Sequence, residues 1–456
     1  MKTKLHLAFV VAFLLLGCGG SDPSGPTPMP ATEPTPVPFV LPDPVNILFV
    51  GNSYTFGRVA PVLQYNTATV TDLTASFNDR SPATNAWPVG NGAVGSTLCQ
   101  TTTLNTGCFE PKPWGGVPAI FKSLTDQASL NYVVSHSTRN AATLRGHFLN
   151  TADPLWDMQS NIAKSKWDVV VLQGQSDEPL SPTKSKNGNP VQFTKYANLI
   201  AEYIHTGVGG ATTEAAIYGS LANCTATFTA TPPGPGGSRT SCNALRTITA
   251  NVSANSRAKV FLMQTWARPD MVEAHKCTQA DQSTLDGSPK LDATCDTGAN
   301  GSTATGMNIL YYTSKTTTSA NLADMTTDMF NIFTSIATTT RTTGDLRFAG
   351  VLPVGNAFQQ AVTAGVVKNS GFYKPDGTFD DSGTQMNLWW KDSTHASKFG
   401  SYLSALVTFG RLTGLNPTRF DGLDRAAADL GISRSQAQTL QGVARDTLIA
   451  SGLSLR

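Results

Sequence analysis

Short, nearly all-apolar runs that stop at turn-forming residues constrain the fold of this chain most. The first covers residues 46–50 and ends in Gly51-Asn52-Ser53. Such a run is typical of a parallel strand buried on both faces, and Gly-Asn-Ser favours a tight turn after it. Ligands bind at the carboxyl ends of strands in open α/β sheets, so Ser53 is a candidate nucleophile. An ordinary turn serine is the alternative.

Similar runs recur along the chain and alternate with helical patterns. We expect further strands over residues 130–135, 167–173, 259–266 and 348–354. We expect helices over residues 116–124, 156–166, 193–205, 243–255, 322–338 and 402–412. Buried strands that alternate with helices predict an α/β fold, a three-layer α/β/α sandwich around a parallel sheet of about five strands.

The N-terminus has the features of an export signal. Lys2 and Lys4 precede the apolar run 7–16, which is too short to span a membrane comfortably, and Gly17-Cys18 follows. Residues 1–17 therefore resemble a bacterial lipoprotein signal peptide. Cleavage before Cys18 would leave its thiol lipidated and anchor the chain to the cell envelope, and Gly19 favours the outer membrane. A secretory signal cleaved elsewhere is the alternative.

After residues 1–17, the composition of the 456-residue chain indicates a linker followed by one domain. Residues 18–44 are rich in Pro, Ser and Thr and predict a semi-extended linker. We see no internal repeat and no later composition break, so residues 45–456 form one expected domain, with insertions near 58–113, 206–242 and 268–305. With 33 Lys plus Arg against 31 Asp plus Glu and no basic run, nothing indicates a nucleic-acid partner.

Cysteine usage agrees with export. Besides Cys18, six cysteines fall into sequence-local pairs, and we predict disulfides Cys99–Cys108, Cys224–Cys242 and Cys277–Cys295. Six cysteines permit fifteen connectivities, so the other pairings stay open. A metal site is disfavoured because no Cys-x-x-Cys occurs and only Cys277 lies near a histidine, His275.

A second cluster of reactive residue types stands near the C-terminus. Asp392-Ser-Thr-His395 comes just before an apolar helical run. Both side chains can point into one site, with His395 as general base and Asp392 as the group that orients it. A serine nucleophile needs an oriented base, so this pair strengthens the interpretation of Ser53 as a nucleophile. A surface aspartate beside a helix-capping turn is the alternative.

The order of three motifs resembles the SGNH hydrolase superfamily of GDSL-like esterases and acetylesterases. They are Gly51-Asn52-Ser53, Gln173-Gly174-Gln175 and Asp392-x-x-His395, and the similarity covers residues 45–414. The resemblance implies a flavodoxin-like fold, with Ser53 as nucleophile, His395 as base and Asp392 as its partner. It implies no metal and no cofactor.

The same resemblance implies donors to a developing oxyanion. Such families place a backbone N–H and a side-chain amide there. The implied donors are the Ser53 backbone, the Gln173 amide with Gln175 as the alternative, and the segment Asn140-Ala141, which stands where relatives often show Gly-Gly. For His136 and His147 we favour structural roles. The segments 264–268 and 353–358 also resemble family segments, and Trp266 is expected to line the pocket or pack in the core.

Together these features predict a serine esterase that forms an acyl-enzyme. The resemblance favours short acyl esters, such as O-acetyl groups on carbohydrate. Two alternatives remain: a non-catalytic lipoprotein that binds polysaccharide on the same scaffold, and an esterase that acts on lipids or polyesters. The expected partners are an ester substrate and, through the lipid anchor, a membrane. The oligomeric state is open.

Overall fold

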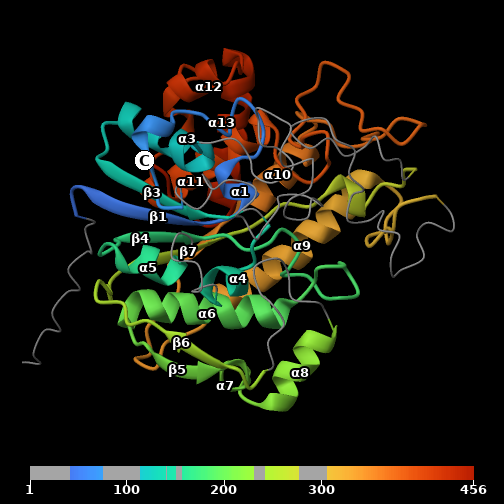
Figure 1. Cartoon of the computed structure of the whole chain (residues 1–456). Coiled ribbons are helices and arrows are strands. Elements are labelled where there is room, and N and C mark those ends of the chain that lie inside the picture. The colour runs from blue at the N-terminus through green and yellow to red at the C-terminus, as the bar shows by residue number, and fades with distance from the viewer. Residues whose placement is uncertain (1–41, 75–112, 140, 150–156, 231–241, 277–305) are drawn as a thin grey trace, which may run out of the picture. The chain divides into compact units, whose positions relative to one another are not determined.

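The computed structural model describes residues 42–74, 113–139, 141–149, 157–230, 242–276 and 306–456 (Figure 1). Several predicted features therefore lie outside the described residues. They are the signal peptide, Cys18, most of the linker, the Cys99–Cys108 and Cys277–Cys295 disulfides, Asn140, and much of the insertions near 58–113 and 268–305.

A parallel sheet of six strands forms the centre. Its order is β2 (Thr71–Asp72), β3 (Tyr132–Thr138), β1 (Val45–Gly51), β4 (Val169–Leu172), β7 (Lys259–Met263) and β8 (Gly350–Leu352). Every neighbouring pair is parallel. The five predicted strands are present, and the short β2 adds a sixth at one edge. β1 lies between β3 and β4, which places the end of the first apolar run inside the sheet.

Helices cover both faces of this sheet (Figure 1). Those described here are α1 (Ser53–Phe56), α3 (Gly116–Gln127), α4 (Leu144–Leu149), α5 (Met158–Ala163), α6 (Pro190–Thr206), α7 (Glu214–Tyr218), α8 (Leu221–Ala230), α9 (Thr318–Ala337), α10 (Val354–Thr363), α11 (Lys398–Thr413), α12 (Arg425–Asp429) and α13 (Arg434–Ala450). In the view shown, α3 and α11 to α13 lie on one side of the sheet and α5 and α6 on the other.

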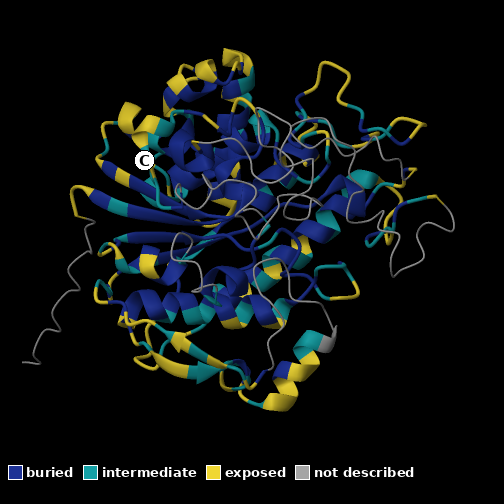
Figure 2. Ribbon diagram, in the orientation of Figure 1, coloured by how far each residue is buried: buried dark blue, intermediate teal, exposed yellow. Residues whose placement is uncertain are grey.

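Alternate residues of β1 point into two separate cores. Ile47 and Phe49 pack with buried residues of α3, α10, α11 and α13. Leu48 and Val50 pack with buried residues of α4, α5 and α6. Figure 2 shows this buried interior on both sides of the strands. A strand with two buried faces must be apolar at successive positions, so this packing explains the run that the sequence displays and confirms the three-layer α/β/α architecture.

The helix predicted over residues 243–255 is wrong. Its first part is a strand, β6 (Leu245–Ile248), which pairs antiparallel with β5 (Gly210–Thr213). Side-chain exposure alternates along β6 as it does in a two-sided strand. The predicted Cys224–Cys242 disulfide is present just before it, with a sequence separation of 18 residues. A short segment with no strong intrinsic preference adopts the secondary structure that its pairing partner allows. Here the partner is the strand β5, more than thirty residues earlier, so residues 245–248 become a strand.

The chain beyond Gly414 adds two helices that the sequence analysis left unassigned. α13 begins with a capping box, in which Ser433 and Gln436 exchange side-chain to backbone hydrogen bonds. Its apolar side packs into the core that also contains α3 and α11. Among the described residues, no helix is both long enough and apolar enough to cross a membrane.

Candidate active site

Ser53, His395 and Asp392 lie in one line of hydrogen bonds. Ser53 is the first residue of α1, directly after β1, and its Oγ is 2.7 Å from His395 Nε2. The other ring nitrogen of His395, Nδ1, is 2.6 Å from Asp392 Oδ2. Ser53 and His395 are 342 residues apart in sequence. The fold therefore brings together the three residues that the sequence analysis singled out.

Asn52 fixes the turn that presents Ser53. Its Oδ1 accepts a hydrogen bond from the Tyr54 backbone N–H at 3.1 Å, which caps α1. Its Nδ2 donates to the carbonyls of Ala142 and Gly174, both at 3.1 Å. One buried amide thus ties together the segments that follow β1, β3 and β4. The Asn of the Gly-Asn-Ser motif holds the neighbouring loops in place as well as shaping the turn.

Gly51 has a steric reason to lack a side chain. A Cβ at this position would lie 2.1 Å from Thr55 Oγ1 and 2.7 Å from Gln173 Oε1. These two oxygens are themselves hydrogen-bonded at 2.8 Å. The close approach of β1, α1 and the Gln173 turn therefore excludes any larger residue unless these groups move.

The loop before α11 orients His395 through Asp392. Asp392 Oδ1 accepts the backbone N–H of His395 at 2.9 Å, so one carboxylate binds both the ring and the backbone of the same histidine. Burial by itself would raise the pKa of Asp392, but the adjacent His395 ring and its hydrogen bonds hold that pKa well below its usual value. Asp392 is therefore ionised at neutral pH.

The predicted oxyanion donors have different surroundings. The Ser53 backbone N–H has no hydrogen-bond partner in the part of the chain that the structure describes. Ala141 has φ +54°, a left-handed conformation that is uncommon outside glycine. Asn140, the other residue of that segment, lies outside the described residues. Among the described residues no group accepts a hydrogen bond from the Ser53 N–H, and these contacts do not test the segment 140–141.

Gln173 stabilises the turn that presents Ser53. Its Oε1 accepts from the Asn52 backbone N–H at 2.9 Å and from Thr55 Oγ1 at 2.8 Å, and its Nε2 donates to the Gly174 carbonyl. An oxyanion role would require Nε2 to leave that carbonyl, so this role stays a prediction. The alternative residue, Gln175, accepts from the Glu178 backbone N–H at 3.1 Å and donates to Ser176 Oγ at 3.2 Å.

The two competing histidines are engaged elsewhere. His136 lies in β3, with Nδ1 3.1 Å from Thr138 Oγ1 and Nε2 3.2 Å from the Trp114 carbonyl. His147 lies in α4, where burial lowers its pKa to about 3 and keeps it neutral. The hydrogen bonds of the His136 ring and the contact of the His147 ring with the Gly51 backbone agree with the structural roles expected for both.

A buried ion cluster lies close to Tyr54, the residue after Ser53, and no sequence motif predicts it. Arg268 Nε donates to Asp270 Oδ1 at 3.0 Å, and an Arg268 terminal nitrogen lies 3.5 Å from Asp177 Oδ1. Burial would raise the pKa of Asp177, but Arg268 and the hydroxyl of Ser185 lower it overall. Both segments directly follow strands, and this position was the only available signal in the sequence.

Glu178 follows Asp177 in the sequence, but its buried carboxyl group differs from that of Asp177 in its partners and in its pKa. Its Oε1 accepts from Gln192 Nε2 at 2.7 Å, while Oε2 has no partner among the described residues. Burial raises the pKa of Glu178 to about 8. At neutral pH this carboxyl group is therefore mostly protonated, unlike Asp392.

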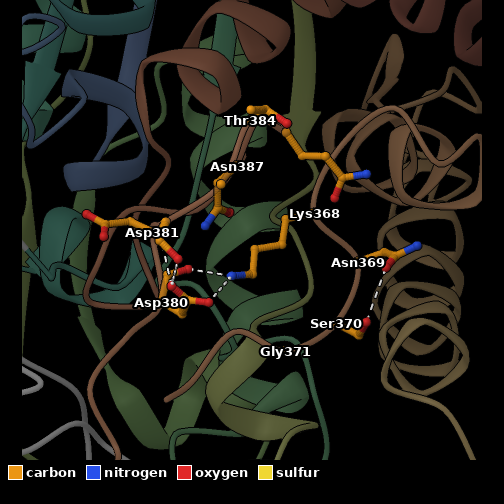
Figure 3. A pocket seen from close by; sticks show the side chains of 11 residues that line it. Lys368, Asn369, Ser370, Gly371, Asp380, Asp381, Thr384 and Asn387 are labelled. Atoms are coloured by element: carbon orange, nitrogen blue, oxygen red, sulfur yellow. Dashed lines mark hydrogen bonds and ion pairs between the residues drawn. The ribbon is translucent and has the colours of Figure 1, made fainter.

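A polar hollow lies on the segment that leads into the His395 loop (Figure 3). It has a volume of about 460 Å³ and is lined by residues 368–371, 380–385 and Asn387. Lys368 Nζ donates to Asp380 Oδ2 at 3.0 Å across it. Ser53 and His395 are not among its lining residues. No group of three or more His, Cys, Asp or Glu residues suited to a metal ion occurs within the described ranges.

Comparisons with known proteins give only distant matches. No protein-family model matches the chain, and no curated protein does. One solved structure, a DUF4886 family protein from Bacteroides uniformis, matches with 11% identity and a TM-score of 0.38 over 91% of this chain and 98% of its own. A candidate SGNH hydrolase from Slackia heliotrinireducens matches with 14% identity and a TM-score of 0.31 over 81% of this chain and 99% of its own. At these scores the likenesses carry no argument about activity.

Proposed function

We propose that this protein is a serine ester hydrolase with Ser53 as nucleophile, His395 as general base and Asp392 as the group that orients the base. The observation that carries the proposal is the unbroken line from Ser53 Oγ to His395 at 2.7 Å and from His395 to Asp392 at 2.6 Å. A hydroxyl bound to a ring nitrogen, with the opposite nitrogen bound to an ionised carboxylate, is the arrangement that activates a serine.

The proposed reaction has two halves. Ser53 Oγ attacks the ester carbonyl carbon while its proton passes to His395 Nε2, and the same proton then goes to the departing alcohol oxygen. Water enters, gives a proton to His395 and cleaves the acyl-enzyme, which regenerates Ser53 and releases the acid. Asp392 stays ionised and stabilises the imidazolium in both halves. The Ser53 backbone N–H, the segment 140–141 and the Gln173 amide are the proposed oxyanion donors.

For the substrate we propose short acyl esters, with O-acetyl groups on carbohydrate as the first choice. This rests on the similarity of Gln173-Gly174-Gln175 to acetylesterase motifs and on the expected location at the cell surface. Esters of lipids or polyesters are the alternative within the same chemistry. Comparing the release of acetate from acetylated xylan with hydrolysis of tributyrin and of a long-chain p-nitrophenyl ester separates these substrate classes.

A serine-directed probe tests the mechanism directly. We expect a fluorophosphonate to label wild-type protein at Ser53 and the protein to hydrolyse p-nitrophenyl acetate, because both require an activated hydroxyl. The Ser53→Ala variant should lose both. Ser404→Ala is the matched control, since Ser404 is also buried but donates only to the Gly400 carbonyl within α11.

Two outcomes would contradict the mechanism. The first is full esterase activity in Ser53→Ala, because the serine would then not be the nucleophile. The second is the absence of labelling in folded wild-type protein. That second result would favour the non-catalytic alternative, in which the scaffold binds polysaccharide.

Membrane attachment through Cys18 is a separate proposal. It rests on Gly17-Cys18 after the apolar run 7–16. In a bacterial host, radiolabelled palmitate should enter the wild-type protein and not the Cys18→Ser variant. Equal incorporation into both proteins would rule out Cys18 as the lipidated residue.

A further inference from the structure

The indole of Trp266 lies between the two segments that carry Ser53 and His395. Trp266 follows β7 and is 1% exposed. One face of its indole stacks on Tyr54, the residue after Ser53, with ring centroids 4.1 Å apart and an interplanar angle of 25°. The other face stacks on Phe358 of α10 at 4.7 Å and 4°. The indole is held on both faces, so its edge has a fixed direction.

That edge points at the histidine loop. Trp266 Nε1 donates to the carbonyl of Thr394, the residue before His395, at 3.1 Å. A second indole makes the opposite connection, because Trp389 Nε1 donates to the carbonyl of Ala267 at 2.9 Å. We call this crossed pair of hydrogen bonds from Trp266 and Trp389 the indole clasp. It joins the segment after β7 to the loop that contains Asp392 and His395.

We propose that Trp266 is a positioning residue that sets the distance between Ser53 and His395, an inference that rests on the proposed function. The face of its ring locates α1 through Tyr54, and its N–H locates the loop through Thr394. Proton transfer requires heavy atoms within hydrogen-bond reach, and a displacement of about 1 Å is enough to slow a reaction strongly. Among the described residues the indole N–H of Trp266 donates to Thr394 and not to Ser53 or His395, so Trp266 acts through its two neighbours.

The chemical requirement is specific to tryptophan. Phenylalanine keeps an aromatic face for Tyr54 and Phe358 but has no N–H to donate. Trp266→Phe therefore preserves most of the stacking and removes the link to the Thr394 carbonyl. The loop then loses one of the two bonds of the clasp, and His395 gains freedom to move away from Ser53.

Trp167, just before β4 of the central sheet, offers a matched control. Trp167 is also buried, at 4% exposed, and its Nε1 donates to a main-chain carbonyl, that of Ile162, at 2.8 Å. It stands just before β4, at the strand end opposite to the one that Ser53 follows on the parallel neighbour β1. Trp167→Phe therefore makes the same chemical change with the same kind of lost bond, but away from the site.

The experiment measures kcat and KM for p-nitrophenyl acetate and the rate of fluorophosphonate labelling in both variants. For Trp266→Phe we expect kcat and the labelling rate to fall by roughly tenfold, with KM within about twofold of wild type, because positioning affects the reacting geometry more than binding. Trp167→Phe should stay within about twofold of wild type in all three quantities. Equal behaviour of the two variants would overturn the proposal.

A second readout does not depend on catalysis. The proton between His395 Nδ1 and Asp392 should give a low-field resonance in wild-type protein with ¹⁵N-labelled histidine, identified by its loss in Asp392→Asn. We expect it to broaden or vanish in Trp266→Phe and to persist in Trp167→Phe. If wild-type protein resists labelling, the proposed function fails, but this resonance still shows whether Trp266 holds the loop that carries Asp392 and His395.

If Trp266→Phe does not fold, Trp389→Phe tests the clasp from the other side. It removes the donor to Ala267 and leaves Trp266 in place. The same loss of kcat and of the low-field resonance is expected. Wild-type values for folded Trp389→Phe would refute the clasp as a device that positions His395.

Discussion

The buried carboxyl group of Glu178 makes stability depend on pH in a way that one substitution removes. Its ordinary pKa is 4.5, and burial raises the pKa in the folded protein to about 8. Between these values the folded protein keeps a proton that the unfolded chain releases. The stabilisation from this group is therefore complete below pH 4.5, declines as the pH rises, and is lost above about pH 8.

The magnitude follows from the width of that window. Each pH unit within it lowers the free energy of unfolding by up to about 1.4 kcal/mol, so by pH 7 the loss is about 3 kcal/mol. Glu178→Gln keeps an oxygen that can accept from Gln192 and has no charge to bury. The variant should therefore gain stability over wild type by about 1.4 kcal/mol per pH unit between pH 5 and 8, and no further above that.

Urea unfolding at pH 5, 6, 7, 8 and 9 measures this difference by linear extrapolation. Glu202→Gln is the control, because Glu202 lies on α6, partly exposed, and pairs with Arg347 at 3.4 Å. The stability gained by Glu178→Gln between pH 5 and 8 should exceed the stability gained by Glu202→Gln over the same range. A flat difference for Glu178→Gln over the same range would refute the assignment of a protonated, buried carboxyl group at neutral pH.

Three further predictions concern the site and the scaffold. Asp392→Asn should lower kcat by about 10⁴-fold at pH 7, measured with p-nitrophenyl acetate, because the amide cannot stabilise the imidazolium; loss of less than tenfold would contradict an orienting role. Gly51→Ala should lower the free energy of unfolding in urea by about 1–3 kcal/mol, since its Cβ would meet Thr55 Oγ1 at 2.1 Å. The control Gly442→Ala has open space around the Cβ inside α13 and should raise that free energy by about 0.5–1 kcal/mol. Replacing both cysteines of the Cys224–Cys242 disulfide with serine should cost about 3 kcal/mol from the 18-residue loop that it closes, seen as a lower Tm that reducing agent no longer changes.

The polar residues that complete the site show why its surroundings were harder to predict than its centre. Ser53 and the Asp392–His395 pair carry their own local signals, a strand end and a motif before a helix. Arg268 and Asp177 carry only their position after a strand, and their pairing becomes interpretable only when β4 and β7 lie side by side. The Gln173 amide could be placed after its strand from sequence, but its use as a brace for Asn52 depends on β1 and β4 being neighbours.

The sequence by itself predicted the α/β class, the five longer strands, the place of Ser53 at a strand end and, among several possible connectivities, the Cys224–Cys242 pairing. Buried strands, turns and local cysteine pairs leave their mark within a few residues. Only the tertiary structure decided that residues 245–248 form a strand, that Ser53 meets His395 across 342 residues, and that Trp266 joins their two segments. These depend on the strand order β3-β1-β4-β7, which is set by packing of the whole sheet and which no local pattern encodes.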